Sequence, residues 1–265
     1  MRVLIFFISA VTLVTTHSHA QILKVDKGSI DADSSGYFIG SIDANFNINN
    51  RSTTAEKEVV FKGLDVSADM VYISEKHAYI LINNINYFTS TGGPLISTGY
   101  VHFRTNFFRK KIMSYELFTQ IQYDNGRNMP YRFLAGGGLK FNLMSSKKSD
   151  LFVGIGVMRE DEHWKLVNMD NLIIEKTIWK TSDYISANIE INEFVDFNLI
   201  TYYQGGYDND SDVFRSRISG DAVLTVKISD RVSFLTSFTA QYDDKPIINI
   251  NPWVYSLTNG LKWNF

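Results

Sequence analysis

The sequence predicts an all-β fold, an antiparallel up-and-down transmembrane β-barrel of about 12 strands. Three observations favour it. Apolar and polar residues alternate in segment after segment, short and longer connections alternate between those segments, and the last strand carries aromatic side chains at both ends of its apolar face. The mean hydropathy is −0.10. Because barrel strands alternate polar with apolar residues, a low mean hydropathy agrees with a barrel.

The first twenty residues predict a cleaved signal peptide, residues 1–20. Arg2 gives a positive start, residues 3–14 are almost entirely apolar, and Ser18, His19 and Ala20 have the small-x-small pattern of a cleavage site. The apolar run is too short for a membrane anchor. We expect a mature chain beginning at Gln21, a short periplasmic segment over residues 21–35 and a barrel over 36–265.

The alternation places each expected strand along the chain. In the first strand, Phe38, Ile42 and Phe46 oppose Asp43 and Asn45. In the last, Trp253, Tyr255 and Leu257 oppose Ser256 and Thr258. The most regular patterns cover 38–48, 195–204, 214–228, 232–242 and 253–265, and less regular ones cover 58–72, 78–87, 101–107, 115–123, 131–143, 151–158 and 179–191.

The connections are expected to alternate in length. Short turns are predicted at 74–76, 110–111 and 229–231, and longer loops at 90–97, 159–171 and 243–251. A bacterial barrel keeps its short turns in the periplasm, so the longer loops are expected to face outward. The alternative is a soluble two-sheet sandwich, but its apolar side chains would face inward and it needs no aromatic residues at both strand ends.

Three stretches carry a resemblance to a known family. They are GYFIGSIDANFNINN, MSYELFTQIQYDNGRNMPYRFLAGGGLKFNL and DLFVGIGVMRED, together with a terminal strand that ends in Phe265. On these, the chain resembles the domain-of-unknown-function 481 family of Gram-negative outer-membrane β-barrels, often labelled salt-induced outer-membrane proteins. The resemblance implies a cell outer-membrane location and no established reaction. It also implies that Trp263 and Phe265 form a signal for the barrel-assembly machinery.

Composition excludes several functions. The chain has no cysteine, so thiol catalysis, thiolate metal sites and disulfides are absent. Removing Arg2 from the 26 basic residues leaves 25 against 28 acidic ones, a formal charge of −3, with no basic block of the kind that binds nucleic acid. We expect outer-membrane lipids and lipopolysaccharide as partners, no nucleic acid and no cofactor, and the sequence sets no oligomeric state.

The residues with the greatest chemical potential are better explained structurally. His77, His102 and His163 fall near a turn, on the lumen face and in a long loop, so we expect no shared metal site. A lipid hydrolase would need a serine and a histidine facing lipid, whereas His102 faces inward. We expect no enzyme activity.

Two further motifs are better explained by structural roles than by ligand binding. Asp208, Asp210 and Asp212 begin like a calcium loop, but Val213 replaces its glycine and Ser219 its glutamate. A solvated acidic turn is favoured, with loose binding of the divalent ions that bridge lipopolysaccharide as the alternative. Glycines 136–138 lack the features of a phosphate loop and are expected to relieve crowding in a strand.

The most distinctive constellation is a set of charges on the polar strand face, which would line the lumen. Its members are Asp43, Arg104, Glu116, Arg132, Lys140, Asp196, Arg215, Arg217, Asp221, Lys227 and Lys262. They either line a conducting path or pair across the lumen and seal it, and a barrel of twelve strands is compatible with both. Mixed signs on long side chains favour partial occlusion.

Three functions follow. The leading expectation is a narrow or gated pore for small polar solutes, or a factor for envelope integrity. The alternative is a non-conducting surface or scaffold barrel that binds lipopolysaccharide or a partner. A lipid-modifying enzyme of the outer membrane is the third, and the least favoured.

Overall fold

The computed structural model describes residues 35–50, 59–146, 148–166 and 172–263, which form a single antiparallel sheet of thirteen strands. One 3₁₀ turn, η1 (Asn125–Arg127), interrupts them, and the described part of the chain has no helix long and apolar enough to cross a membrane. The expected signal peptide, Gln21 and Phe265 lie outside the described residues. The strands are β1 (Tyr37–Asn50), β2 (Val60–Ile73), β3 (His77–Ser90), β4 (Gly93–Phe107), β5 (Met113–Asp124), β6 (Met129–Ser145), β7 (Ser149–Leu166), β8 (Leu172–Thr181), β9 (Asp183–Asn192), β10 (Val195–Asp208), β11 (Val213–Lys227), β12 (Val232–Asp243) and β13 (Trp253–Trp263).

The all-β prediction is confirmed, and the count differs from about 12 because one long strand is divided. β9 pairs with the first part of β7, and β8 pairs with its second part. Ser182 lies between β8 and β9 and donates its backbone N–H to the Gly156 carbonyl at 2.9 Å. β8 and β9 therefore succeed one another along β7, and the predicted strand 179–191 spans their junction.

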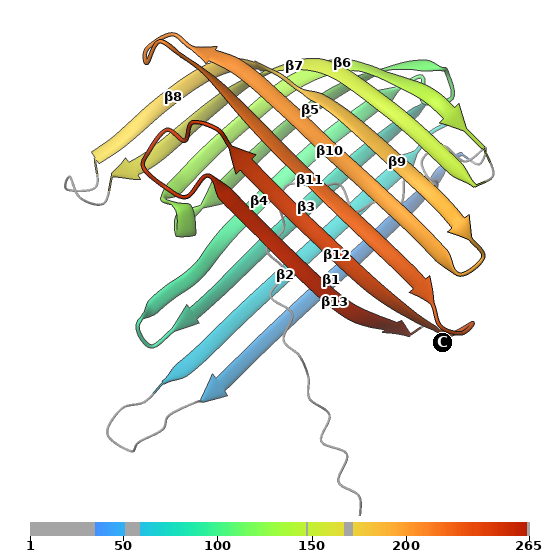
Figure 1. The fold of residues 1–265 in the computed structure, drawn as a ribbon, viewed down its shortest axis with the longest axis horizontal. Helices are drawn as coiled ribbons and strands as arrows, with labels where there is room; N and C mark the ends of the chain where they lie inside the picture. The colour runs from blue at the N-terminus through green and yellow to red at the C-terminus, as the bar shows by residue number, and fades with distance from the viewer. Residues whose placement is uncertain (1–34, 51–58, 147, 167–171, 264–265) are drawn as a thin grey trace, which may run out of the picture.

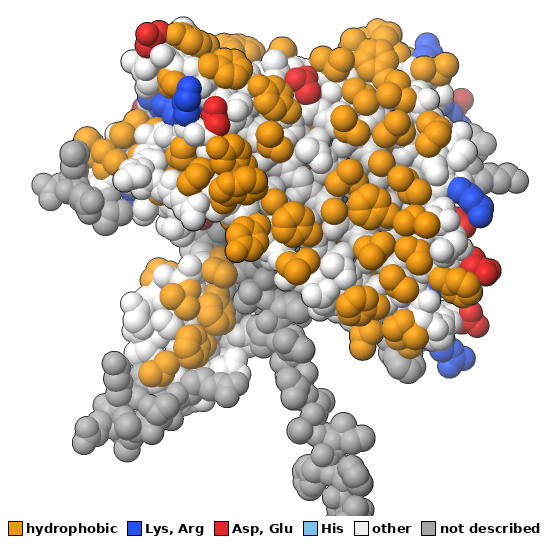
Figure 2. Space-filling model, viewed as in Figure 1, with side chains coloured by type: hydrophobic (Ala, Val, Ile, Leu, Met, Phe, Trp, Pro, Cys, Tyr) orange, Lys and Arg blue, Asp and Glu red, His pale blue; other side chains and the backbone are white. Residues whose placement is uncertain are grey.

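Period-two alternation decides which side chains face each way. On β12 and β13, Phe238 opposes Leu257 on the outward face, while Thr239 opposes Ser256 on the inward face. The outward face is apolar: Ile42 is 78% exposed and Leu257 is 61% exposed. Figure 2 shows hydrophobic side chains spread over this face, with charged ones mostly near its margins. The buried side chains include many polar and charged ones, the reverse of a soluble core.

The sheet coils so that its inward face encloses a space, which we call the lumen. In Figure 1, β10 to β13 lie in front of β3 to β6 and cross them. Side chains meet across this space: Arg104 of β4 donates to Tyr202 of β10, and Tyr184 of β9 donates to Glu116 of β5. β1 and β13 are the two edges of the sheet, and no pairing joins them among the described residues.

Connections define two ends of the lumen. The turn end holds the links at 74–76, 108–112, 193–194 and 228–231, together with Ser146 and Lys148. The loop end holds η1 and the links at 91–92, 209–212 and 244–252. The short turns predicted at 74–76, 110–111 and 229–231 are confirmed, as is the longer loop near 243–251. Two predicted loops differ from the structure. Residues 90–97 mostly belong to β3 and β4, and residues 159–166 of the loop predicted at 159–171 continue β7, while its residues 167–171 lie outside the described residues.

An apolar cluster fills part of the lumen at the turn end. Val71 and Ile73 of β2 pack with Ala78, Ile80 and Ile82 of β3, and all five are buried. These residues stand at inward positions, so the inward face is not polar throughout. The cluster narrows the lumen beside β2 and β3.

Candidate functional site

The centre of the lumen contains a buried ion pair between Arg104 and Glu116. The Arg104 Nη1 lies 3.8 Å from the Glu116 Oε2. The Tyr184 hydroxyl donates to the same oxygen at 2.8 Å, and the Arg104 Nη2 donates to the Tyr202 hydroxyl at 3.4 Å. The guanidinium also lies 5.7 Å from the ring centroids of Phe118 and Tyr184. Both charges are thus compensated, and the contacts tie β4 and β5 to β9 and β10.

A larger group of charges lies between this centre and the loop end, and we call it the ion network. Its members come from five strands: Arg132, Glu160, Glu162, Lys180, Arg217 and Asp243. All six side chains are buried.

Glu160 occupies the middle of the ion network. It accepts from the Arg132 Nε at 2.8 Å and from the Arg217 Nη1 at 2.9 Å, and it forms an ion pair with Lys180. Glu162 lies 3.0 Å from Arg132 and 3.1 Å from Arg217. Buried charges are tolerated only when paired and hydrogen-bonded, and this alternation of signs meets that condition.

The loop 244–252 covers the lumen above the ion network. Ile248 of this loop is buried against Met129 of β6 and Trp164 of β7. The Trp164 Nε1 donates to Glu162 at 3.0 Å, which joins the apolar contact to the ion network. Asp243, at the base of the loop, pairs with Arg217 and with Arg127 of η1. The loop is therefore held in place by the ion pairs of Asp243 at its base and by the apolar contacts of Ile248.

A further ionic group lies at the rim of the loop end. Asp208 is fully buried and accepts from Lys176 at 3.1 Å and from the Arg215 Nε at 2.9 Å. Burial opposes the ionisation of Asp208, but its hydrogen bonds from Lys176, Arg215 and Ser211 outweigh burial and lower its pKa to about 2. Lys176 also pairs with Asp210, and Asp212 accepts from Tyr207. Asp208 is therefore buried and paired, whereas Asp210 and Asp212 are exposed in the turn, as the prediction of a solvated acidic turn expects, and also contact Lys176 and Tyr207.

The remaining sequence-predicted lumen charges are scattered. The Lys140 Nζ lies 4.0 Å from the Phe152 ring centroid, and Asp221 accepts from Thr239 at 3.1 Å. Asp196 and Lys227 pair at 3.5 Å near the turn end, half in solvent, and Asp43 is exposed on the inward face of β1. Lys262 and Trp263 belong to β13, but their side chains lie outside the described part of the chain.

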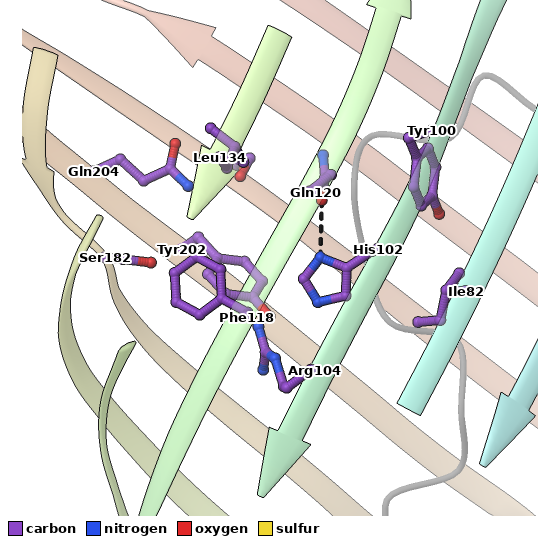
Figure 3. A pocket seen from close by; sticks show the side chains of 11 residues that line it. Ile82, Tyr100, His102, Arg104, Phe118, Gln120, Leu134, Ser182, Tyr202 and Gln204 are labelled. Carbon is purple, nitrogen blue, oxygen red and sulfur yellow. Dashed lines mark hydrogen bonds between the residues drawn. The ribbon is translucent and has the colours of Figure 1, made fainter. Parts of the chain in front are cut away.

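A cavity of about 30 Å³ lies beside the central ion pair. Its lining includes Tyr100, His102, Arg104 and Gln204 (Figure 3). The His102 Nδ1 bonds the Gln120 Oε1 at 2.9 Å. The His102 Nε2 and the Gln204 Oε1 are buried and have no hydrogen-bond partner among the described residues. The cavity can accommodate one or two water molecules, which would satisfy both atoms.

The three histidines stay apart. His77 lies at the turn end against Phe107, His102 lies in the lumen, and His163 stands 4.0 Å from Glu175. The prediction that His163 lies in a loop is wrong, because it belongs to β7. Among the described residues, no three potential metal-binding side chains are grouped.

The glycines of β6 serve close strand packing. A Cβ on Gly136 or Gly138 would overlap the backbone of β7, and one on Gly137 would overlap that of β5. This arrangement agrees with the structural reading of this segment.

Sequence reasoning missed four of the six members of the ion network. Glu160, Glu162 and Asp243 fall in the segments predicted as loops, 159–171 and 243–251. Lys180 falls in the predicted strand 179–191, whose alternation is too irregular to indicate which of its residues face inward. The available signal was the alternation beyond residue 158, where Glu160, Glu162 and Trp164 stay in phase with the inward positions of β7.

Comparison with known proteins identifies a family for the chain. No curated protein matches the chain. The model of the family described as "Protein of unknown function, DUF481" matches residues 62–251, from β2 to the loop before β13. The chain therefore belongs to the DUF481 family.

Proposed function

We propose that this protein is an integral outer-membrane β-barrel, closed by pairing of β1 with β13, whose lumen is a narrow passage for small polar solutes. The apolar outward face supports the membrane location. Soluble proteins rarely expose apolar patches beyond a few hundred Å². Here Phe38, Leu117 and Trp179 are 77%, 56% and 67% exposed, and similar side chains occur on the other strands.

Aromatic side chains support a boundary at each end of the apolar face. At the turn end, the rings of Phe38 and Tyr72 and those of Tyr72 and Tyr79 contact one another across neighbouring strands, with centroids 4.6 and 6.1 Å apart. At the loop end, Tyr242 lies 4.6 Å from Trp253. Such belts mark the two interfaces of a membrane. Trp179 of β8 pairs with Arg159 of β7. From this pair toward the loop end, the outward face of β7 carries the polar residues Arg159 and Asp161, as expected where strands leave the lipid.

The observation that carries the pore is the unequal filling of the lumen. On β4 to β11, the inward face is packed with long, paired side chains such as Arg104, Arg132 and Glu160. On β1, β2, β12 and β13, the inward side chains are mostly small and polar, and many are exposed or half-buried: Ser41, Asp43, Asn45, Ser67, Ser237, Ser256 and Thr258. We assign the passage to this side, which we call the small-residue wall.

Conductance in planar bilayers tests the pore. The refolded protein is expected to give small, discrete current steps in salt solution. Ser67→Trp should reduce the step size, because residue 67 points into the lumen. Its neighbour Ala68 points outward, so Ala68→Trp is the matched control and should leave the step unchanged. Complete absence of steps in every salt would refute the pore.

A second candidate function is a non-conducting surface barrel whose loop end binds lipopolysaccharide. The observation that favours it is the packing of Ile248 against Trp164 and Met129, which covers the lumen. Under this alternative, the protein gives no current steps. Shortening the loop 244–252 would then abolish binding to lipopolysaccharide vesicles and leave the strand content unchanged.

A further inference from the structure

We infer that the turn end carries a binding site for the headgroup of an anionic phospholipid, formed where the turns 74–76 and 108–112 meet. This inference rests on the proposed membrane location and is independent of the pore. Short turns of bacterial barrels lie in the periplasm, so the site would border the leaflet that faces the periplasm. The two turns contain four basic residues and one acidic residue, Glu75. Their charge favours an anionic partner.

Hydrogen bonds fix the two turns against each other. Ser74 closes the first turn, since its Oγ donates to the His77 carbonyl at 3.0 Å and accepts from the His77 N–H at 2.9 Å. Arg109 joins the second turn to the first, because its backbone N–H donates to the Lys76 carbonyl at 3.0 Å and its Nε to the Ser74 carbonyl at 3.1 Å. Arg109 is buried, whereas Lys76 and Lys111 are exposed. The site is therefore formed in advance, with two cations at its surface.

His77 supplies a hydrogen-bond donor beside these cations. It stands at an outward position, opposite Phe107 of β4. Its Nδ1 accepts from the Phe108 N–H at 3.3 Å, which assigns the proton of the neutral ring to Nε2. Among the residues that the structure describes, no hydrogen-bond partner occupies this Nε2. The Nε2 N–H is therefore available to donate to a phosphate oxygen.

Apolar side chains beside the cations favour a lipid over a free anion. The Lys111 Nζ lies 5.1 Å from the centroid of the Phe108 ring, a cation–π contact. The Phe108 ring is 39% exposed, and its centroid lies 5.5 Å from that of His77 and 6.2 Å from that of Tyr115. Ile112 is 77% exposed. Cations next to exposed aromatic and aliphatic groups match a phosphate that is attached to acyl chains, whereas inorganic phosphate offers nothing to the apolar groups.

Native mass spectrometry of the refolded protein, titrated in detergent micelles with phosphatidylglycerol, measures this binding. We expect phosphatidylglycerol to bind more tightly than phosphatidylcholine. The double variant Lys76→Gln, Lys111→Gln should weaken its binding about tenfold, because it removes both exposed cations. His77→Phe keeps an aromatic ring but removes the Nε2 donor, and it should also weaken binding. The matched control, Lys148→Gln with Arg231→Gln, removes two exposed charges from other turns and should leave binding unchanged.

The outcomes separate this site from general attraction and from the membrane location. Equal losses in the two double variants, or equal affinity for phosphatidylcholine, would overturn the site. Displacement of phosphatidylglycerol by an equal concentration of inorganic phosphate would overturn the recognition of lipid. Insertion into phosphatidylcholine vesicles without a preference for phosphatidylglycerol would overturn this inference alone. Failure to insert into any vesicle would overturn the membrane location and the inference with it.

Discussion

Replacing Glu160 with Gln is expected to lower the free energy of unfolding by about 3–5 kcal/mol, because it leaves buried charges uncompensated. Glu160 pairs with Arg132, Lys180 and Arg217 in the ion network. Without its charge, Lys180 loses the one ion-pair partner that it has among the described residues, while Arg132 keeps Glu162 and Arg217 keeps Glu162 and Asp243. Equilibrium urea unfolding of the refolded protein in phospholipid vesicles would measure the change.

The neighbour Asp161 is the matched control for this variant. Asp161 pairs with Arg159 on the outward face, where the arginine is half-exposed. Exposed ion pairs contribute about 0–1 kcal/mol, so Asp161→Asn should have a small effect. Adding Lys180→Gln to Glu160→Gln should recover part of the loss, since it removes one uncompensated cation. Equal effects of Glu160→Gln and Asp161→Asn would show that the ion network contributes little.

Replacing Gly154 with Val is expected to displace Tyr184 from the lumen. A Cβ at residue 154 would overlap the Tyr184 ring, which lies over this glycine. Overpacking costs about 1–3 kcal/mol, and losing the hydrogen bond from Tyr184 to the charged Glu116 costs about 1.5–3 kcal/mol more. The loss should appear in urea unfolding and in the ultraviolet absorption of buried tyrosine.

Gly260 of β13 provides the control, because a Cβ there would meet no atom within 4 Å. Gly260→Val should therefore leave stability nearly unchanged. In the double variant with Tyr184→Ala, Gly154→Val should add little to the cost of Tyr184→Ala alone. A full additional loss in the double variant would mean that the ring is not what Gly154 accommodates.

The sequence predicted the strands because their determinant is local. Alternation on β1 and on β10 to β13 can be read from consecutive residues, and the structure keeps those patterns in register. The prediction of a longer loop at residues 90–97 was wrong, since this segment contains Gly92, Gly93 and Pro94 but forms only a tight reversal. Gly93 takes a φ of +120°, which a glycine tolerates, so the chain reverses within two residues. Pro94 then pairs beside a register shift at Thr89.

The ion network could not be predicted because its partners are remote in sequence. Residues 159–166 carry charge on both faces, so no apolar alternation marks them as a strand. Glu160 and Glu162 become tolerable inward residues only because Arg132 and Arg217 approach from β6 and β11. The alternation of the sequence predicted that Arg132 and Arg217 face inward, but it did not predict which acidic residues they bind. The burial of Ile80 and Ile82 on the inward face could not be predicted for a similar reason, since the residues that they pack against are on β2.

The central claim is that the outward face contacts lipid while the inward face lines a polar lumen. Single-tryptophan variants in bilayers of brominated lipid test it directly, because bromine quenches only the tryptophans that it can contact. Trp179 is 67% exposed on the outward face, whereas Trp164 is 2% exposed within the lumen. We predict strong quenching of Trp179 and little quenching of Trp164. Equal quenching of the two, or none of Trp179, would contradict the claim.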